Sequence, residues 1–325
     1  MPLRPVPWAI GNGAENSVEL ARADSFIGSA GATGIIAPAD LKVVQTPTPG
    51  AAVRVRKGTG VISSTYAGVF GQSYVVQEQS NEDVPVAATG SSGGATKYVY
   101  ILIEDTQYGG QTPPSVENGP YNSYKVTTTL PQNQPYLLLA KIDQPKSTAT
   151  ITNAMITDMR EIANPRTYPV LRANPLNTDE VETLTATGDA GEWFPNAGGG
   201  QVIKIPELAT RAIIEAEWLM INERQGNAYG GIWVEWGPYV SSGIREYSTQ
   251  HMRWNSVAVN DNVRNSWKVA DEVYIPPAVR GTEQWFAMKA RISYASGNGA
   301  RPQMDQHSGT LIKVTFLQVP DPSTS

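Results

Sequence analysis

The chain has 325 residues, of which 30 are glycine, 24 are proline and none is cysteine, and its formal net charge at pH 7 is −5. Without cysteine it cannot form disulfides or thiolate metal sites, and a mild negative charge without a basic stripe does not favour nucleic acid as a partner. No apolar run reaches the length of a signal peptide or a membrane span, so we expect a soluble protein with no membrane insertion.

Residues 1–165 are predicted to form a β-rich domain. The stretch AAVRVRKG places Val53 and Val55 on one face and Arg54 and Arg56 on the other. This two-residue period is that of a half-buried strand. Strand-sized runs such as KYVYILIED and YLLLAKID follow, separated by Gly-rich turns. Few windows hold the 3.6-residue period of a helix, so we expect mostly β-structure.

The segment 152–163 is the exception and is predicted to form one short amphipathic helix at the end of this domain. Met155, Met159 and Ile162 recur at helical spacing and would form one apolar face. The helix would end before Pro165, because the residue that precedes a proline is disfavoured in the α region. We expect it to cover the sheet and to fix where the next segment leaves the domain.

Residues 166–190 combine prolines, threonines and acidic residues and are predicted to be a linker. Beyond it, residues 191–325 alternate apolar and polar side chains; in TLIKVTF, Ile312, Val314 and Phe316 share one face. The number and alternation of these strands predict a jelly-roll-like β-sandwich, which would form a distal domain. The predicted fold class is therefore all-β: an N-terminal β-rich domain that ends in a short helix, followed by this sandwich.

The sequence contains no common catalytic motif. HEXXH, GXSXG and Walker A patterns do not occur, and there are two histidines. A glycosidase needs only two carboxylates, and the candidate acid is Glu235, with Glu215 or Glu217 as its partner. Acidic residues on the polar face of a strand are ordinarily solvated, however, and no spacing selects a pair. We therefore predict no enzymatic activity, no catalytic residue, no metal site and no cofactor.

Aromatic side chains on predicted polar strand faces indicate a saccharide site instead. A flat indole or phenol can stack on the C–H face of a sugar while nearby amides and acids bind its hydroxyl groups. The candidate glycan-binding residues are Trp233, Glu235, Trp285, Tyr229, Tyr239 and Tyr247. Burial of the same faces between subunits would explain the pattern equally well.

Two stretches of the first half resemble a known family of phage proteins. The run PYLLLAKIDQPKSTATITNAMITDMRE resembles a recurring segment of minor tail and upper-baseplate-like, receptor-binding proteins of tailed phages that infect actinobacteria. Upstream, PADLKVVQTPTPGAAVRVRKGTGVI resembles the opening of the same family. The similarity covers about residues 20–165. It implies an architectural role for residues of the first run that match the family pattern, Ile151, Met155, Ile156, Asp158 and Arg160.

The resemblance implies a structural protein of the virion, located in the phage tail, with other phage tail proteins as partners. Residues 1–165 would attach to the virion, and the distal sandwich would face the host and bind a cell-surface saccharide or receptor. A homotrimer is the expected assembly for such a part. Two alternatives stay open: a polysaccharide-degrading tail enzyme that uses Glu235 or another acid, and a purely structural tail protein with no glycan site.

Overall fold

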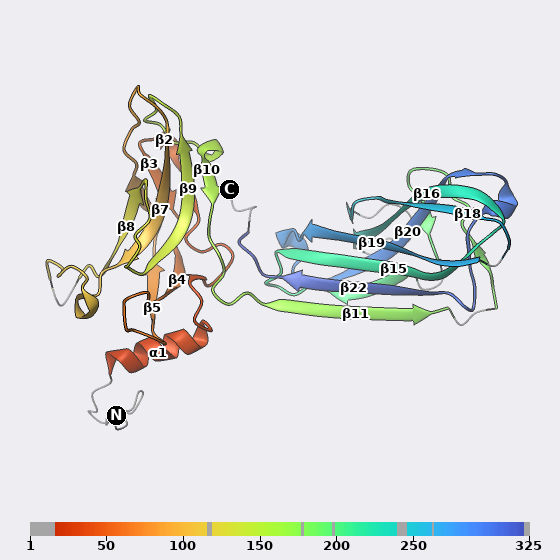
Figure 1. The fold of residues 1–325 in the computed structure, drawn as a ribbon, viewed down its shortest axis with the longest axis horizontal. Coiled ribbons are helices and arrows are strands. Elements are labelled where there is room, and N and C mark those ends of the chain that lie inside the picture. The colour runs from red at the N-terminus through yellow and green to blue at the C-terminus, as the bar shows by residue number, and fades with distance from the viewer. Residues whose placement is uncertain are drawn as a thin grey trace. The chain divides into compact units, whose positions relative to one another are not determined.

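The computed structural model of the chain describes residues 17–115, 119–176, 179–196, 199–238, 246–261 and 263–321. These residues form mainly β-strands, with one short α-helix near the N-terminus, so the all-β fold class is confirmed (Figure 1). They divide into two compact units. Unit 1 comprises Met1–Pro165 together with Val319–Ser325, and unit 2 comprises Arg166–Gln318. Each unit has a hydrophobic core of its own.

Unit 1 packs three small antiparallel sheets around its core in the described part of the chain. One sheet has the order β1 (Gly34–Ile35), β4 (Gly58–Ser63) and β5 (Ser73–Glu78), and another has β2 (Val43–Gly50), β3 (Ala52–Val55) and β6 (Glu82–Pro85). The third has the order β10 (Ile156–Asp158), β9 (Tyr136–Gln144), β7 (Ala95–Ile103) and β8 (Asn122–Thr127). Helix α1 (Val18–Gly28) precedes the sheets, and two short 3₁₀ turns are η1 (Thr106–Tyr108) and η2 (Asn153–Met155).

The helix predicted over residues 152–163 is wrong. Only the 3₁₀ turn η2 forms there, and the chain then continues as the edge strand β10, which pairs with β9. Ile156 and Thr157 are β-branched, and the open edge of β9 offers backbone partners to an extended segment but not to a helix. The helix that does form, α1, was not predicted, and none of its side chains is buried.

The segment after β10 nevertheless fixes the point where the chain leaves unit 1. Ile35 donates its N–H to the carbonyl of Glu161 at 2.7 Å, and Ala163 donates to the carbonyl of Ile35 at 3.0 Å. Arg160 is 4% exposed, and its guanidinium binds both carboxylate oxygens of Asp158, at 2.9 and 2.7 Å. The exit of the chain from unit 1, which the predicted helix was expected to fix, is thus fixed by extended backbone and one buried arginine.

Unit 2 is an antiparallel sandwich of two sheets, each of which has four longer strands and two two-residue strands in the described part of the chain. One sheet has the order β11 (Thr167–Pro175), β22 (Gly309–Leu317), β15 (Arg211–Glu223) and β19 (Val263–Tyr274), extended by β21 (Gln303–Met304) and β12 (Glu182–Thr183). The other has the order β14 (Gly200–Lys204), β20 (Glu283–Ala295), β16 (Gly226–Gly237) and β18 (Met252–Ala258), with β13 (Glu192–Trp193) beside β20 and β17 (Tyr247–Ser248) beside β16. Two 3₁₀ turns are η3 (Pro277–Val279) and η4 (Asn298–Ala300).

This strand order is that of a jelly roll. When the eight long strands are numbered along the chain, the sheets read 1-8-3-6 and 2-7-4-5, as two nested Greek keys require. The predicted alternation is present: Ile214, Val269 and Val314 of one sheet are fully buried, as are Phe286 and Met288 of the other. The predicted jelly-roll-like sandwich is confirmed.

The linker predicted over residues 166–190 is wrong over residues 167–175. Thr167–Pro175 form β11, which pairs with β22 along all nine residues. Most β11 side chains are exposed on both faces of this edge strand, so it lacks the alternation that marks a half-buried strand. For this reason, the composition of β11 resembles that of a loop.

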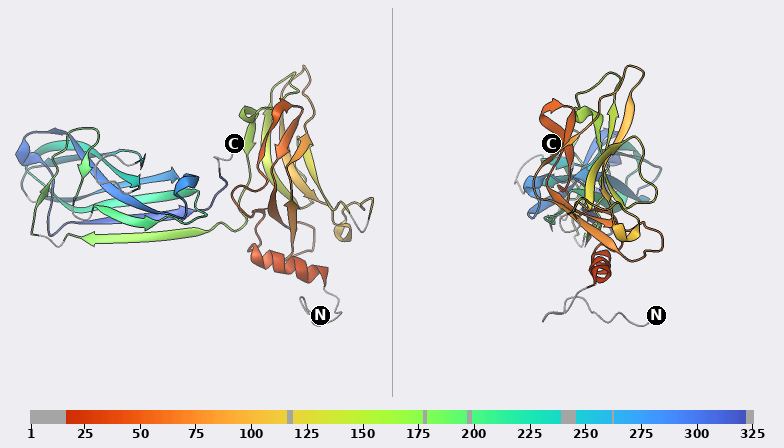
Figure 2. Two further views of the ribbon diagram at one scale, coloured as in Figure 1. Left: turned by 180° about the vertical axis from the view of Figure 1, so that it is seen from behind. Right: turned by 90° about the vertical axis from the view of Figure 1, so that its left-hand side faces the viewer.

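The C-terminal segment returns to unit 1 rather than ending in the distal sandwich. Arg166 and Gln318 exchange hydrogen bonds where the chain enters and leaves unit 2. Beyond them, Asp321 is 3% exposed and donates its N–H to the carbonyl of Pro38 at 3.1 Å. Figure 2 shows the strands of the two units from two further sides. Unit 2 is thus inserted into unit 1.

None of the helices in the described ranges combines the length and apolar character needed to span a bilayer.

Candidate functional site

The candidate residues lie mainly on one sheet of unit 2, around the central strand β16. Ile232, Val234 and Trp236 point from this strand into the core. The alternate residues point the other way, to a surface that we call the outer face. On β16 the outer face carries Tyr229, Gly231, Trp233 and Glu235, and it continues on the outward residues of β20 and β18.

Trp233 is buried on this face, contrary to the prediction of an exposed indole. It is 1% exposed, because the ring of His251 stacks on it at a centroid distance of 4.1 Å and an angle of 10°. The backbone at Gly191 covers it as well; a Cβ added there would lie 2.4 Å from the indole. The loop around Gly191 therefore closes over a residue that strand alternation alone places on the surface.

Glu235 is held in a closed polar cluster beside Trp233. Its Oε1 accepts a hydrogen bond from Nε1 of Trp233 at 2.9 Å, and its Oε2 lies 3.6 Å from Nζ of Lys289. The side chains of Glu235 and Lys289 are 5% and 6% exposed. Glu215 and Glu217, its possible catalytic partners, lie on β15 in the other sheet, where both pair with Lys268. The structure therefore does not assemble the predicted pair of carboxylates.

The remaining indole and phenol candidates are separated from this cluster. Trp285 is half-buried and stacks on Trp193 at 6.1 Å. Tyr247 is half-buried against the core and stacks on Trp236 at 4.4 Å, and burial together with the neighbouring carboxylate of Glu246 raises the pKa of its hydroxyl. Tyr239 lies outside the described residues.

Tyr229 is the candidate whose surroundings most resemble a binding site. It is 46% exposed and stacks on the equally exposed Tyr294 of β20, with ring centroids 5.5 Å apart and an angle of 22°. It lines a surface depression of about 510 Å³, which we call the Tyr229 hollow. The depression is lined by Asn227, Tyr229, Gly230, Arg253, Trp254, Asn255 and Val257.

The hairpin of β16 and β18 positions the polar groups of the hollow. Tyr229 lies opposite Asn255 in the antiparallel register, and Asn227 lies opposite Val257. Gly230 permits close packing at the floor, since a Cβ there would lie 1.9 Å from the carbonyl oxygen of Arg291. Two carboxamides beside an exposed aromatic pair can form hydrogen bonds with hydroxyl groups while the rings contact an apolar face.

Three basic side chains lie further along the outer face. Arg253 and Arg291 flank Gly231 from β18 and β20, and Arg291 forms an ion pair with Asp189. Burial lowers the pKa of His251, and Arg291 lowers it further. The imidazole that covers Trp233 is therefore held in its neutral form at pH 7.

Sequence reasoning missed Tyr294, Asn255 and Arg253. Tyr294 lies on β20, and Asn255 and Arg253 lie on β18, whereas Tyr229 lies on β16. Only the register of β16 with β18 and β20 brings these side chains together. Alternation predicts which face a residue takes, but it does not predict which strands become neighbours.

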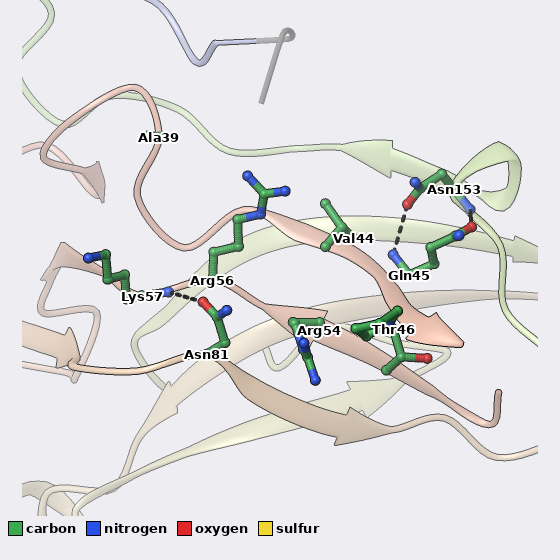
Figure 3. A pocket seen from close by; sticks show the side chains of 10 residues that line it. Ala39, Val44, Gln45, Thr46, Arg54, Arg56, Lys57, Asn81 and Asn153 are labelled. Carbon is green, nitrogen blue, oxygen red and sulfur yellow. Dashed lines mark hydrogen bonds between the residues drawn. The ribbon is translucent and has the colours of Figure 1, made fainter. Parts of the chain in front are cut away.

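Unit 1 has a second surface hollow, of about 530 Å³, on the sheet that contains β2 and β3 (Figure 3). Arg54, Arg56 and Lys57 line part of it, and Arg54 is neutralised by a bidentate pair with Asp83. Figure 3 also shows how other lining residues bind each other: the backbone N–H of Gln45 and the side chain of Asn153 are hydrogen-bonded at 2.8 Å.

No group of three or more His, Cys, Asp or Glu side chains suited to a metal ion occurs among the residues that the structure describes.

Comparison with known proteins gives weak similarity only. No protein-family model and no curated protein matches the chain. Among solved structures, the chain is similar to the VP2 subviral particle of infectious bursal disease virus, with 12% identity, 94% of this chain and 78% of that chain covered, and a TM-score of 0.26. A structure of the Gx strain of the same virus gives 11% identity, coverages of 90% and 72%, and a TM-score of 0.23. The chain is thus weakly similar to proteins of a viral particle. At such TM-scores the similarity supports no conclusion about its function.

Proposed function

We propose that the chain is a structural minor tail protein of the tail tip or baseplate of a tailed phage that infects actinobacteria, and that unit 2 contacts glycan on the host surface. The first part is supported by the resemblance of residues 20–165 to that family. The matching residues have architectural contacts in unit 1: Ile151 is fully buried, and the buried Arg160 forms a bidentate pair with Asp158. Other phage tail proteins would be the partners of unit 1.

The glycan contact is carried by one observation, the exposed pair of Tyr229 and Tyr294 beside the carboxamides of the Tyr229 hollow. Saccharide sites in proteins combine aromatic platforms with a few placed polar groups, because a sugar presents both C–H faces and hydroxyl groups. Of the six residues predicted from the sequence, Tyr229 belongs to this site. Trp233 and Glu235 lie on the same outer face but are buried there.

In this proposal the protein binds without cleaving. The acid singled out from the sequence, Glu235, is enclosed with Lys289 and the indole of Trp233 and lacks the open position that a general acid needs beside a glycosidic bond. A glycan-cleavage assay tests this point. Release of reducing ends by the wild-type chain, lost in a Glu235→Gln variant, would replace binding by hydrolysis.

A homotrimer is part of the same proposal, and the edge strand β11 supports a contact between subunits. Tyr168 is 58% exposed and Leu171 is 56% exposed on this nine-residue strand, whose outer edge pairs with no other described strand. Long exposed edge strands with apolar side chains are ordinarily covered. Light scattering should give a trimeric mass for the wild type and a smaller mass for Leu171→Glu; an unchanged monomeric mass in both would exclude this contact.

The glycan contact is tested with the full chain on an array of bacterial surface saccharides. The wild type should bind a subset of them, and Tyr229→Ala should weaken binding by about tenfold, as loss of an aromatic platform does. Tyr121→Ala, which removes an exposed tyrosine from unit 1, is the matched control and should bind like the wild type. Absence of binding by the wild type would contradict the proposed contact and favour the purely structural alternative.

The location in the tail is tested separately. Antibodies against the chain should label the tail end of phage particles that encode it in electron micrographs. Labelling of the head, or no labelling of intact particles, would contradict the proposal.

A further inference from the structure

The Tyr229 hollow has a positive charge at its rim and no acidic residue in its lining. Arg253 lines it, is exposed, and forms no ion pair with any residue in the described ranges. The other lining side chains are two asparagines, a tyrosine, a tryptophan and a valine, together with one glycine. An exposed guanidinium without a carboxylate partner keeps its five donors available to a ligand.

A second arginine, Arg291, lies next to Arg253, with Gly231 between them. Gly231 pairs with Arg253 on one side and with Arg291 on the other. A Cβ built on Gly231 would lie 3.6 Å from Nε of Arg291, so this N–H lies over the glycine between the two arginines. The Nε atom is buried and has no hydrogen-bond acceptor among the described residues. Asp189, which pairs with Nη1 of Arg291, has a side chain that is 96% exposed.

The arrangement therefore places two guanidinium groups at one end of an aromatic and carboxamide surface. Planar guanidinium forks bind carboxylate and phosphate oxygens in bidentate fashion, and these charge-assisted hydrogen bonds are stronger than those between neutral groups. A neutral sugar would leave Arg253 without a charged partner, whereas a sugar with an acidic substituent would supply one.

Resting on the proposed glycan contact, we propose that the Tyr229 hollow selects saccharides that carry an anionic group, and that Arg253 is the residue that sets this selectivity. The rings of Tyr229 and Tyr294 would contact the sugar, and Asn227 and Asn255 would bind hydroxyl groups. The anionic group would be a carboxylate of a uronic acid or a phosphate of a polyol-phosphate polymer, since both present the same oxygen geometry to arginine.

Calorimetric titration of the full chain with three probes tests the selectivity: a trigalacturonate, its fully methyl-esterified form, and a glycerol-phosphate oligomer. The acid should bind about tenfold more tightly than its ester, the gain expected from one charge-assisted hydrogen-bonded contact. Raising the salt from about 0.05 M to about 0.5 M should weaken binding of the acid but not of the ester. Comparison of the carboxylated and phosphorylated probes distinguishes the two sources of charge.

Three variants assign the effect to a residue. Arg253→Met should bring the affinity for the acid down to that for the ester and leave the ester unchanged, while Arg253→Lys should retain part of the preference. Lys204→Met removes one exposed positive charge from β14, outside the hollow, and should change neither affinity. Thermal unfolding checks that each variant is folded.

The outcomes separate this inference from the proposed function. If the ester binds as tightly as the two anionic probes and Tyr229→Ala weakens all of them, the glycan contact stands and anionic selectivity is wrong. If Arg253→Met weakens binding of the acid and of the ester equally, Arg253 contacts the sugar without recognising its charge, and the assignment is overturned. If no probe and no arrayed saccharide binds the wild type, both proposals fail.

Discussion

The two bidentate arginine–aspartate pairs of unit 1 have the same geometry and different surroundings. Arg54 binds Asp83 at 2.7 and 2.8 Å across two strands, at the protein surface. Arg160 binds Asp158 at 2.9 and 2.7 Å, is 4% exposed, and also donates to the carbonyl groups of Pro38 and Asp40. The buried arginine thus supplies hydrogen bonds that no solvent molecule would replace easily, whereas the exposed one competes with water throughout.

We predict that Arg160→Met destabilises unit 1 by about 3 kcal/mol, because it leaves a carboxylate and two carbonyl oxygens without their donor. Arg54→Met, the matched control, should cost less than about 1 kcal/mol, as exposed ion pairs do. Urea dependence of hydrogen exchange, measured by mass spectrometry on peptides of unit 1, gives both values. Equal losses in the two variants would show that burial does not decide the contribution of Arg160.

A partly buried ion pair of unit 2 predicts that the stability of this unit depends on pH. Arg264 binds both carboxylate oxygens of Asp305, at 2.9 and 2.7 Å, and this hydrogen-bonded pair lowers the pKa of Asp305 below its ordinary value of 3.8. A carboxyl group with a lowered pKa in the folded state contributes stability above its unfolded pKa and loses it as the pH falls through the folded one. The stability difference between wild type and Asp305→Asn should therefore be constant at neutral pH and shrink below about pH 4.

Tryptophan fluorescence measures this difference, because seven of the eight tryptophans lie in unit 2. Urea unfolding of both proteins at pH 7, 5, 4 and 3 gives the curve. A difference that does not change with pH would mean that the ion pair is not formed in solution.

At the scale of elements, the exposed strand β11 and the short strand β10 explain where sequence reasoning failed. β10 has three residues and exists because β9 offers an open edge. β11 is a full strand whose side chains are mostly exposed on both faces. Periodicity arises from one-sided burial, so strands that are very short or exposed on both faces leave no such pattern.

We predict that Val170→Asp destabilises unit 2 by about 2 kcal/mol, since Val170 packs against the core and pairs with Val314. Ala173→Asp, an exposed position on the same strand, is the matched control and should change stability by less than about 0.5 kcal/mol. Urea unfolding followed by tryptophan fluorescence measures both. If Val170→Asp were neutral, residues 167–175 would behave as the linker predicted from the sequence.

The strands with one buried face could be predicted well. In β3 and β22, in β15 up to Trp218 and in β20 up to Ile292, the alternating apolar residues lie on the buried face. Beyond these points Met220 and Tyr294 are exposed, because the strand register shifts at a bulge. The binding face could be predicted only in part. Tyr229 was found by alternation, but burial of Trp233 depends on His251 and Gly191, which approach it through long-range folding of loops.

At the scale of the whole molecule, the jelly roll is an insertion that two chain segments connect to unit 1. The chain enters unit 2 at Arg166 and leaves it at Gln318. Of the returning residues, Asp321 donates its N–H to the carbonyl of Pro38. Two chain segments therefore connect the units, instead of the single flexible linker expected from the sequence.

We predict that deleting residues 319–325 destabilises unit 1 by about 1–2 kcal/mol and leaves unit 2 unchanged, because the deletion removes a buried residue and a backbone hydrogen bond from unit 1 alone. Hydrogen exchange on unit 1 peptides and tryptophan fluorescence of unit 2 report the two effects separately. Loss of stability in unit 2 alone would show that these residues belong to the jelly roll.

The hydrogen-bonded pair of Arg166 and Gln318 has an evolutionary consequence. Both ends of the inserted unit lie within one strand spacing of each other, so any domain whose termini are neighbouring strands can occupy the same position without disturbing the scaffold that carries it. Recombination at these two points would exchange the whole module in one event and leave unit 1 intact.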